Sequence, residues 1–70
     1  MATFAERVRE LRRERGLKQT ELAEICGVKV RSYQRYEHGD GYPEVPGLLF
    51  LAGYFGVSLD YLMGRKDERT

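Results

Sequence analysis

Apolar side chains recur three and four positions apart near the start of the chain, which is the spacing of one face of an α-helix. The residues with this spacing are Phe4, Val8 and Leu11. They predict a helix over residues 3–15. Thr3 is expected to begin it, because Thr3 and Glu6 fit a capping box in which each side chain pairs with the other residue's backbone N–H. Gly16 is expected to end this amphipathic helix.

Two shorter helical segments follow at residues 19–26 and 30–38, and a tight turn joins them. Gly27 lies in the turn, where glycine accepts a positive φ without strain. Ala23 lies where the two helices are expected to cross, and its small side chain lets the backbones approach. The apolar positions are Leu22, Cys26, Val28, Tyr33 and Tyr36. This pattern is typical of a helix-turn-helix, whose second helix enters the major groove of DNA.

The rest of the chain predicts a loop and two more helices. Residues 39–43 contain two glycines and a proline, which favours a loop. Residues 45–55 predict a fourth helix and residues 59–63 a short fifth helix capped by Ser58. The residues of the fourth helix available to the core are Leu48, Leu49, Leu51, Ala52 and Phe55. Residues 1–64 are therefore expected to form one all-α domain, and residues 65–70 a charged tail that frays.

The charge is distributed unevenly, although the formal net charge is only +1. Residues 1–36 carry a net charge of +4 and residues 37–70 a net charge of −3. The basic half contains the predicted helix-turn-helix, as contacts with phosphate require. The basic residues of the first helix interleave with Glu6, Glu10 and Glu14 at spacings that support ion pairs along a helix. These charges are therefore expected to solvate the helix surface.

The sequence lacks the residues or spacings of several kinds of functional site. Cys26 is the single cysteine, so no disulfide can form within the chain, and His38 is the single histidine, which argues against a zinc site. Nothing resembles a nucleophile–His arrangement, paired catalytic carboxylates or a glycine-rich phosphate loop, so the sequence argues against an enzyme. We expect no cofactor, no membrane partner and no small-molecule ligand. A cytoplasmic, nucleoid-associated protein is the default expectation, because no apolar run has transmembrane length and no signal peptide is recognisable.

Three stretches, in order, resemble the lambda-repressor-like (Cro-type) helix-turn-helix family. They are RVRELRRERGLKQTELAEICGV at residues 7–28, RYEHG at residues 35–39 and LAGYFGVSLDYLMG at residues 51–64. The resemblance covers residues 4–64, nearly the whole chain. It implies a compact five-helix lambda-repressor-like bundle that binds double-stranded DNA as a homodimer. It also implies a transcriptional regulator, most often a repressor, whose operator is palindromic.

The resemblance also implies roles for individual residues. The positions that match the family's base-reading residues are Val30, Arg31, Gln34 and Arg35. The positions that match contacts with the DNA backbone are Lys18, Gln19 and Lys29. Gln19 is also expected to brace the second helix of the motif. Arg31 and Arg35 are four residues apart and so share one helix face, and the donor fork of arginine matches O6 and N7 of guanine.

Arg12 and Glu37 match an internal ion pair that ties the first helix to the third in many members of the family. The chain departs from the family pattern at other positions. Lys18 and Lys29 replace the Ser or Thr often found at helix N-caps, and Tyr33 replaces an aliphatic residue, so its hydroxyl needs a partner. Further departures are Asp40, Pro46 and Gly47.

One domain of this size reads few base pairs, so a two-fold dimer is expected, with half-sites ~34 Å apart on the DNA. The candidate interface residues are Phe50, Tyr54, Tyr61 and Met63. Two alternatives to a simple regulator stay open. One is the antitoxin of a toxin–antitoxin pair, which would bind both DNA and a toxin. The other is a protein-association module that has lost DNA binding.

Overall fold

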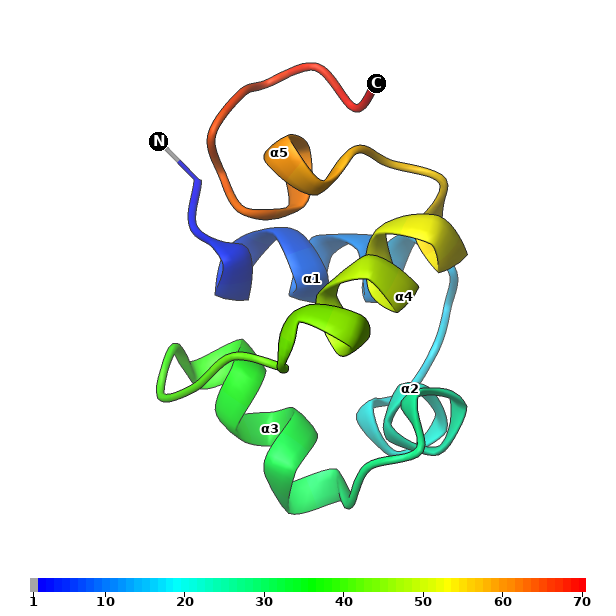
Figure 1. Cartoon of the computed structure of the whole chain (residues 1–70). Helices are drawn as coiled ribbons and strands as arrows, with labels where there is room; N and C mark the ends of the chain where they lie inside the picture. Colours follow the sequence, from blue (N-terminus) through cyan, green and yellow to red (C-terminus); the bar gives the residue numbers. More distant parts are fainter. Residues whose placement is uncertain (1) are drawn as a thin grey trace.

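The computed structural model describes residues 2–70, which form five α-helices and contain no β-strand. The helices are α1 (Phe4–Glu14), α2 (Gln19–Cys26), α3 (Val30–His38), α4 (Val45–Phe55) and α5 (Leu59–Leu62) (Figure 1). The bounds of α2, α3 and α4 are those predicted. Helices α1 and α5 are shorter than predicted because Thr3, Arg15 and Met63 are cap residues. The all-α, five-helix fold class is confirmed.

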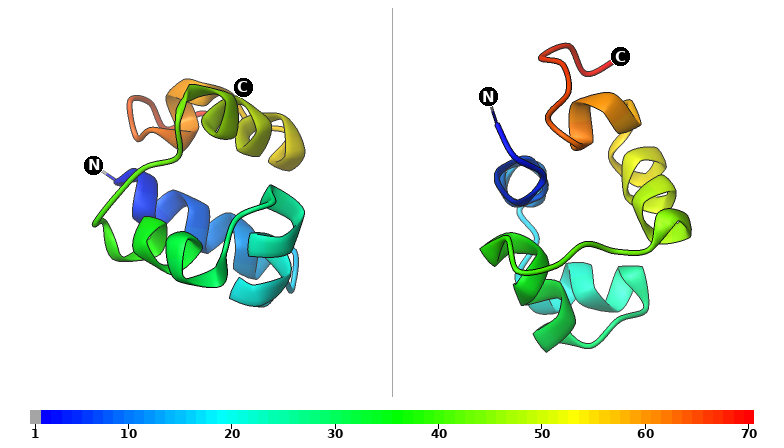
Figure 2. Two further views of the ribbon diagram at one scale, coloured as in Figure 1. Left: turned by 60° about the horizontal axis from the view of Figure 1, so that its bottom comes forward. Right: turned by 60° about the vertical axis from the view of Figure 1, so that its left-hand side comes forward.

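Helix α1 lies at the centre of the arrangement (Figure 2). Helices α2 and α3 pack together on one side of it, and α5 lies on the other side (Figures 1 and 2). Helix α4 contacts both α2 and α5 and so closes the bundle. The core side chains are Phe4, Val8, Leu11, Leu22, Ala23, Tyr33, Leu51, Ala52, Phe55, Val57, Tyr61 and Leu62. All five helices contribute side chains to this core. Because α3 packs through Tyr33, its opposite face points outward.

The predicted cap and turn are present. The Glu6 backbone N–H donates to the Thr3 hydroxyl at 3.2 Å, and the Thr3 backbone N–H donates to the Glu6 carboxylate at 2.9 Å. Gly27 ends α2 with a φ of +71°, the left-handed conformation that glycine adopts without a Cβ penalty. The angle between α2 and α3 is therefore fixed by a turn that the sequence indicates directly.

The basic residues of α1 do not all face solvent: Arg12 is buried, as its predicted ion pair requires, and Arg7 is buried against the expectation. The Arg7 side chain is 6% exposed and stacks over the Tyr61 ring, with 3.8 Å between the guanidinium carbon and the ring centroid. It also donates to the Tyr61 carbonyl at 3.3 Å and pairs with Asp67 at 3.1 Å. Its partners come from α5 and the tail, so the arginine joins elements far apart in sequence instead of pairing along α1.

Residues 65–70 lie beside α1 and α5 in the structure. The Arg69 guanidinium donates to the Glu14 carboxylate at 2.9 Å through one nitrogen and at 2.5 Å through the other. The Arg69 carbonyl accepts the Ser58 backbone N–H at 2.7 Å. The segment that the sequence predicts to fray therefore has ionic and backbone contacts to the folded domain.

The outer face of α4 is apolar and exposed. Leu49, which helical spacing assigned to the core, is 54% exposed, and that assignment is wrong. Val45 and Phe50 are 64% and 45% exposed. No helix within residues 2–70 is long and apolar enough to cross a membrane.

Candidate nucleic-acid interface

Helix α3 has a buried face and an exposed polar face. Tyr33 and Glu37 lie on the buried face, one turn apart. The residues on the exposed face are Val30, Arg31, Gln34 and Arg35. These are the four positions that the sequence predicts to read bases, and the fold brings all four to the surface of one helix.

The Glu37 carboxylate is the centre of a buried hydrogen-bond network. Arg12 donates to it from two guanidinium nitrogens, at 2.6 and 3.1 Å, so the predicted ion pair between α1 and α3 is present. The Tyr33 hydroxyl, whose partner the sequence left open, donates to the same carboxylate. Arg12 also donates to the Leu17 carbonyl at 2.8 Å, which fixes the chain between α1 and α2. Three elements therefore meet at one acidic side chain.

Gln19 extends this network to the protein surface. Its side-chain amide nitrogen donates to Glu37 at 3.0 Å, because a carboxylate can only accept. The Gln19 oxygen therefore faces the other way, where it accepts the Gln34 amide at 3.2 Å. Gln19 thus braces α3, as the family resemblance implies. One candidate base-reading side chain, Gln34, is held in place before any ligand arrives.

Burial and hydrogen bonding set the protonation states in the network. Burial by itself raises the pKa of Glu37, but hydrogen bonds from Arg12, Tyr33 and Gln19, with the Arg12 charge, lower the pKa below its ordinary value. Burial, together with the Glu37 charge, raises the pKa of the Tyr33 hydroxyl above its ordinary value. The network is therefore an anion surrounded by donors, with a neutral tyrosine among them.

The two arginines on the exposed face have different surroundings. The Arg35 guanidinium donates to the Asp40 carbonyl at 3.2 Å, so it lies toward the loop that follows α3. A Cβ at Gly41 would lie 3.6 Å from the same guanidinium, which shows how closely the loop passes. Within residues 2–70, the Arg31 side chain forms no hydrogen bond and no ion pair. Arg31 can therefore turn toward a ligand without losing a contact. Arg35 would first have to break its hydrogen bond to the Asp40 carbonyl.

The predicted backbone-binding residues lie at helix N-termini. Lys18 and Lys29 are the N-cap residues of α2 and α3, both are exposed, and neither caps its helix through its side chain. The Lys18 backbone N–H donates to the Glu21 carboxylate at 2.8 Å. A helix N-terminus carries a partial positive charge, which a lysine reinforces. Lys18, Gln19 and Lys29 thus offer positive or donor groups beside the exposed face of α3.

The candidate interface residues are divided between core and surface. Tyr61 is 5% exposed, so its side chain belongs to the core of the monomer and is unavailable to a partner. Phe50 and Tyr54 stack on each other with ring centroids 5.9 Å apart, and Phe50 faces solvent. Met63 is half-buried against the core. The surface that remains is the outer face of α4.

Among residues 2–70, no three His, Cys, Asp or Glu side chains gather as a metal site would require. Sequence reasoning missed Arg7 because its charge was taken to require solvent, although it lies three residues after Phe4 and four before Leu11, beside the apolar stripe. It also missed the Gln19–Gln34 contact, which depends on the angle between two helices and leaves no signal in the spacing. The chemistry available at α3 is hydrogen bonding and ionic contact.

Comparison with known proteins agrees with this geometry. The sequence model of a family described as "Helix-turn-helix" matches residues 8–62. The chain is 35% identical over 65 residues to the "Uncharacterized HTH-type transcriptional regulator YobD" of Bacillus subtilis (strain 168), covering 93% of this chain and 58% of that protein. It is 37% identical over 64 residues to the "Cryptic phage CTXphi transcriptional repressor RstR" of Vibrio cholerae, covering 91% of this chain and 58% of the relative.

A solved structure is also similar along most of the chain. It is titled "Crystal structure of transcriptional regulator from Listeria innocua" and superposes with a TM-score of 0.86 at 38% sequence identity. The match covers 94% of this chain and 62% of that one. This chain therefore spans somewhat more than half the length of each of these three proteins.

Proposed function

The chain belongs to the Cro/C1-type helix-turn-helix family, and we propose that it binds double-stranded DNA sequence-specifically as a transcriptional repressor. The observation that carries the proposal is the exposed face of α3, with Val30, Arg31, Gln34 and Arg35 directed outward and Glu37 anchoring the helix from behind. A helix presented in this way fits the width of the major groove. The names of the relatives also state transcriptional regulation.

Each side chain on that face has a distinct chemical use. The unpaired Arg31 offers its donor fork to O6 and N7 of a guanine, a contact that contributes ~1–3 kcal/mol of discrimination. Gln34, held by Gln19, offers an amide that matches N6 and N7 of adenine. Val30 offers methyl groups to the methyl group of a thymine. Arg35 reaches either a guanine or a phosphate after leaving the Asp40 carbonyl.

Lys18, Gln19 and Lys29 fix the orientation of α3 on the DNA. Their positions at the N-termini of α2 and α3 suit contacts to phosphate oxygens, which position a protein without reading sequence. These contacts release counterions, so the affinity is expected to fall steeply as the salt concentration rises.

A homodimer on a palindromic operator completes the proposal. The molecule measures 29 × 23 × 20 Å, so two protomers side by side span two half-sites one turn of DNA apart, about 34 Å. We place the contact on the outer face of α4, at Val45 and Leu49, with Tyr54 and the exposed part of Phe50 beside them. Met63 is half-buried against the core, and the buried Tyr61 is no longer a candidate. A dimer bound across a promoter would block transcription and so act as a repressor.

The test is the selection of bound duplexes from a random DNA pool. The wild type is compared with an Arg31→Ala, Arg35→Ala variant, and an Arg13→Ala, Arg65→Ala variant is the matched control. The control removes the same charge from exposed positions on α1 and the tail. A palindromic motif obtained with the wild type and the control, but not with the α3 variant, is the expected result.

Two other outcomes would change the assignment. If the selected DNA motif is a single half-site without two-fold symmetry, the protein binds as a monomer and the proposed dimer is wrong. No enrichment at low salt from a folded protein would overturn DNA binding and favour a protein-association module. Placing the selected site across a promoter that drives a reporter then tests repression, because an activator would raise the signal that a repressor lowers.

A further inference from the structure

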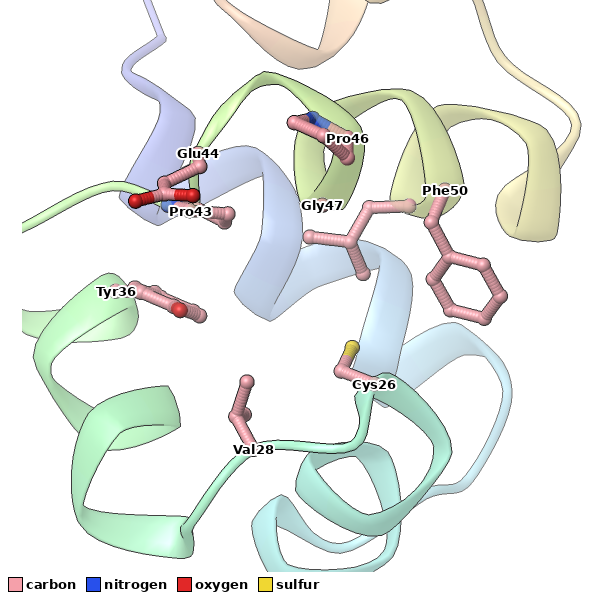
Figure 3. A pocket seen from close by; sticks show the side chains of 9 residues that line it. Cys26, Val28, Tyr36, Pro43, Glu44, Pro46, Gly47 and Phe50 are labelled. Carbon is pink, nitrogen blue, oxygen red and sulfur yellow. The ribbon is translucent and has the colours of Figure 1, made fainter.

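A cavity of about 480 Å³ opens between the helix-turn-helix and α4 (Figure 3). Its walls come from the turn between α2 and α3, from α3, from the loop that follows α3 and from α4. The wall residues that matter most are Cys26, Val28, Tyr36, Glu44, Phe50 and Leu51. Its volume lies within the range of small-molecule sites. No spacing in the sequence indicates this cavity, because four separate segments build it.

The lining is apolar except at one end. Figure 3 shows Tyr36 and Phe50 on opposite sides of the hollow, with Val28 and Cys26 on a third side. Burial raises the pKa of the Cys26 thiol, so this side chain is neutral at pH 7 and adds to the apolar wall. Near the loop, a Cβ at Gly47 would lie only 2.9 Å from the Pro43 Cβ, so the wall is closely packed there.

Glu44 is the single charged residue among the lining side chains, and no basic residue lines the cavity. Within residues 2–70, its carboxylate forms no hydrogen bond and no ion pair, although Glu44 is the N-cap residue of α4. Glu44 is exposed and lies on the same side of the cavity as Tyr36 (Figure 3). An unpaired carboxylate there favours a cation, because the faces of aromatic rings also attract positive charge. The rest of the lining favours hydrocarbon. Charge and polarity therefore point to the same class of ligand.

We propose that this cavity binds a small organic cation, with its protonated amine at Glu44 and its apolar body between Tyr36 and Phe50. An anion would meet the Glu44 charge, and a strongly polar molecule would lose its hydration against Val28 and Leu51. The bound molecule would touch α3, the loop that follows it and α4 at once. The proposal concerns binding alone and stands whether or not the protein binds DNA.

The experiment compares three probes of similar size by titration into the ¹⁵N-labelled protein. They are 2-phenylethylamine, 2-phenylethanol and 3-phenylpropionate, which are cationic, neutral and anionic at pH 7. The amine is expected to give saturable shifts at the amides of Cys26, Val28 and Gly47. It is expected to bind about five-fold more tightly than the alcohol, the effect of one partly exposed ionic and cation–π contact. The acid is expected to bind most weakly.

Two variants make the test specific. Glu44→Gln keeps the shape of the side chain and is expected to reduce the preference for the amine to less than two-fold, while leaving the affinity for the alcohol unchanged. Glu24→Gln removes the same charge from the exposed side of α2, away from the cavity, and is expected to change nothing. Equal binding of amine and alcohol by the wild type would overturn the proposal. A preference that survives Glu44→Gln, or shifts centred elsewhere, would also overturn it.

Discussion

At the scale of single residues, the Glu37 carboxylate connects the core to the exposed face of α3. It accepts hydrogen bonds from Arg12 on α1, Tyr33 on α3 and Gln19 on α2. A buried charge with this many donors holds its neighbours in one geometry, whereas the same charge without a partner is costly. The orientation of Gln34 on the surface therefore depends on a group that no ligand touches.

The first prediction concerns the cost of breaking this ion pair. Glu37→Gln leaves the Arg12 guanidinium buried without its carboxylate, and we expect the free energy of unfolding to fall by about 3 kcal/mol. Adding Arg12→Met removes the stranded charge, so the double variant should be more stable than Glu37→Gln alone. Urea denaturation followed by circular dichroism measures both. A loss below 1 kcal/mol in the single variant would show that the pair is not important for stability.

The second prediction concerns acid. Because folding lowers the pKa of Glu37 below its ordinary value of 4.5, the unfolded chain binds the proton more readily. The resulting stability is present above that value and is lost as the pH falls through the lower pKa of the folded state. The urea midpoint should therefore decrease below pH 4.5. The decrease should be shallower in the Arg12→Met, Glu37→Gln variant, but Glu6 and Glu14, whose pKa values are also lowered, keep it from vanishing. Identical slopes would contradict the assignment.

Single residues also show where sequence reasoning ends. Arg12 was placed correctly because a family resemblance supplied its partner, whereas Arg7 had no such partner and was placed in solvent. The Arg7 partners, Tyr61 and Asp67, lie more than fifty positions away. Periodicity within one helix carries no information on contacts at that separation.

At the scale of elements, α2 and α3 begin at lysines that do not cap them. A cap residue such as serine would stabilise the helix, whereas a lysine at the same place adds a positive charge beside the proposed DNA surface. The two demands compete at one position. At both positions the chain has a lysine where helix stability alone would favour a capping residue.

The third prediction separates the two demands. A serine at position 18 would accept the Glu21 backbone N–H and complete the capping box that Glu21 already half forms. We expect Lys18→Ser to raise the free energy of unfolding by about 0.5–1 kcal/mol and to lower the salt dependence of operator binding by about one phosphate contact. Lys18→Ala should show the same DNA effect without the gain in stability. A Lys18→Ser variant that binds DNA with an unchanged salt slope would remove Lys18 from the interface.

Element boundaries were the most predictable part of the fold, because glycines and cap residues mark them locally. The buried face of α4 was less predictable. Leu48, Leu49 and Leu51 are all apolar, so the pattern does not distinguish the core face from the outer face. The four-residue α5 is too short to show a period, and Tyr61 was therefore taken for a surface residue.

At the scale of the whole molecule, the exposed apolar face of α4 and the exposed polar face of α3 are the two prominent surfaces. A half-site is short, so specificity in a genome calls for two copies of α3 at a fixed separation. In the proposed dimer, the apolar face of α4 is the contact that would set this separation. Interface residues cannot be derived from one sequence, because a residue that packs against a partner has the same character as one that packs inside.

The fourth prediction tests that surface. Leu49→Glu places a charge on the proposed contact surface and is expected to give a monomer in sedimentation equilibrium at concentrations where the wild type is a dimer. Because Leu49 is exposed, the fold should survive the change. Thr20→Glu adds the same charge to exposed α2 and should leave the dimer intact. A wild type that stays monomeric, or a Leu49→Glu dimer, would place the contact elsewhere.

The positions of the chain ends have a practical consequence for engineering. Both ends of the described chain lie on the side of α1 opposite α2 and α3 (Figures 1 and 2). A fluorescent protein, an affinity tag or an effector domain fused at either terminus would therefore extend away from the proposed DNA surface. The better choice is a flexible linker after Thr70, because the Ala2 carbonyl would lie 2.0 Å from a Cβ at Gly64 and so has little room to move. The same scaffold could then carry a reporter or a regulatory cargo to a chosen site.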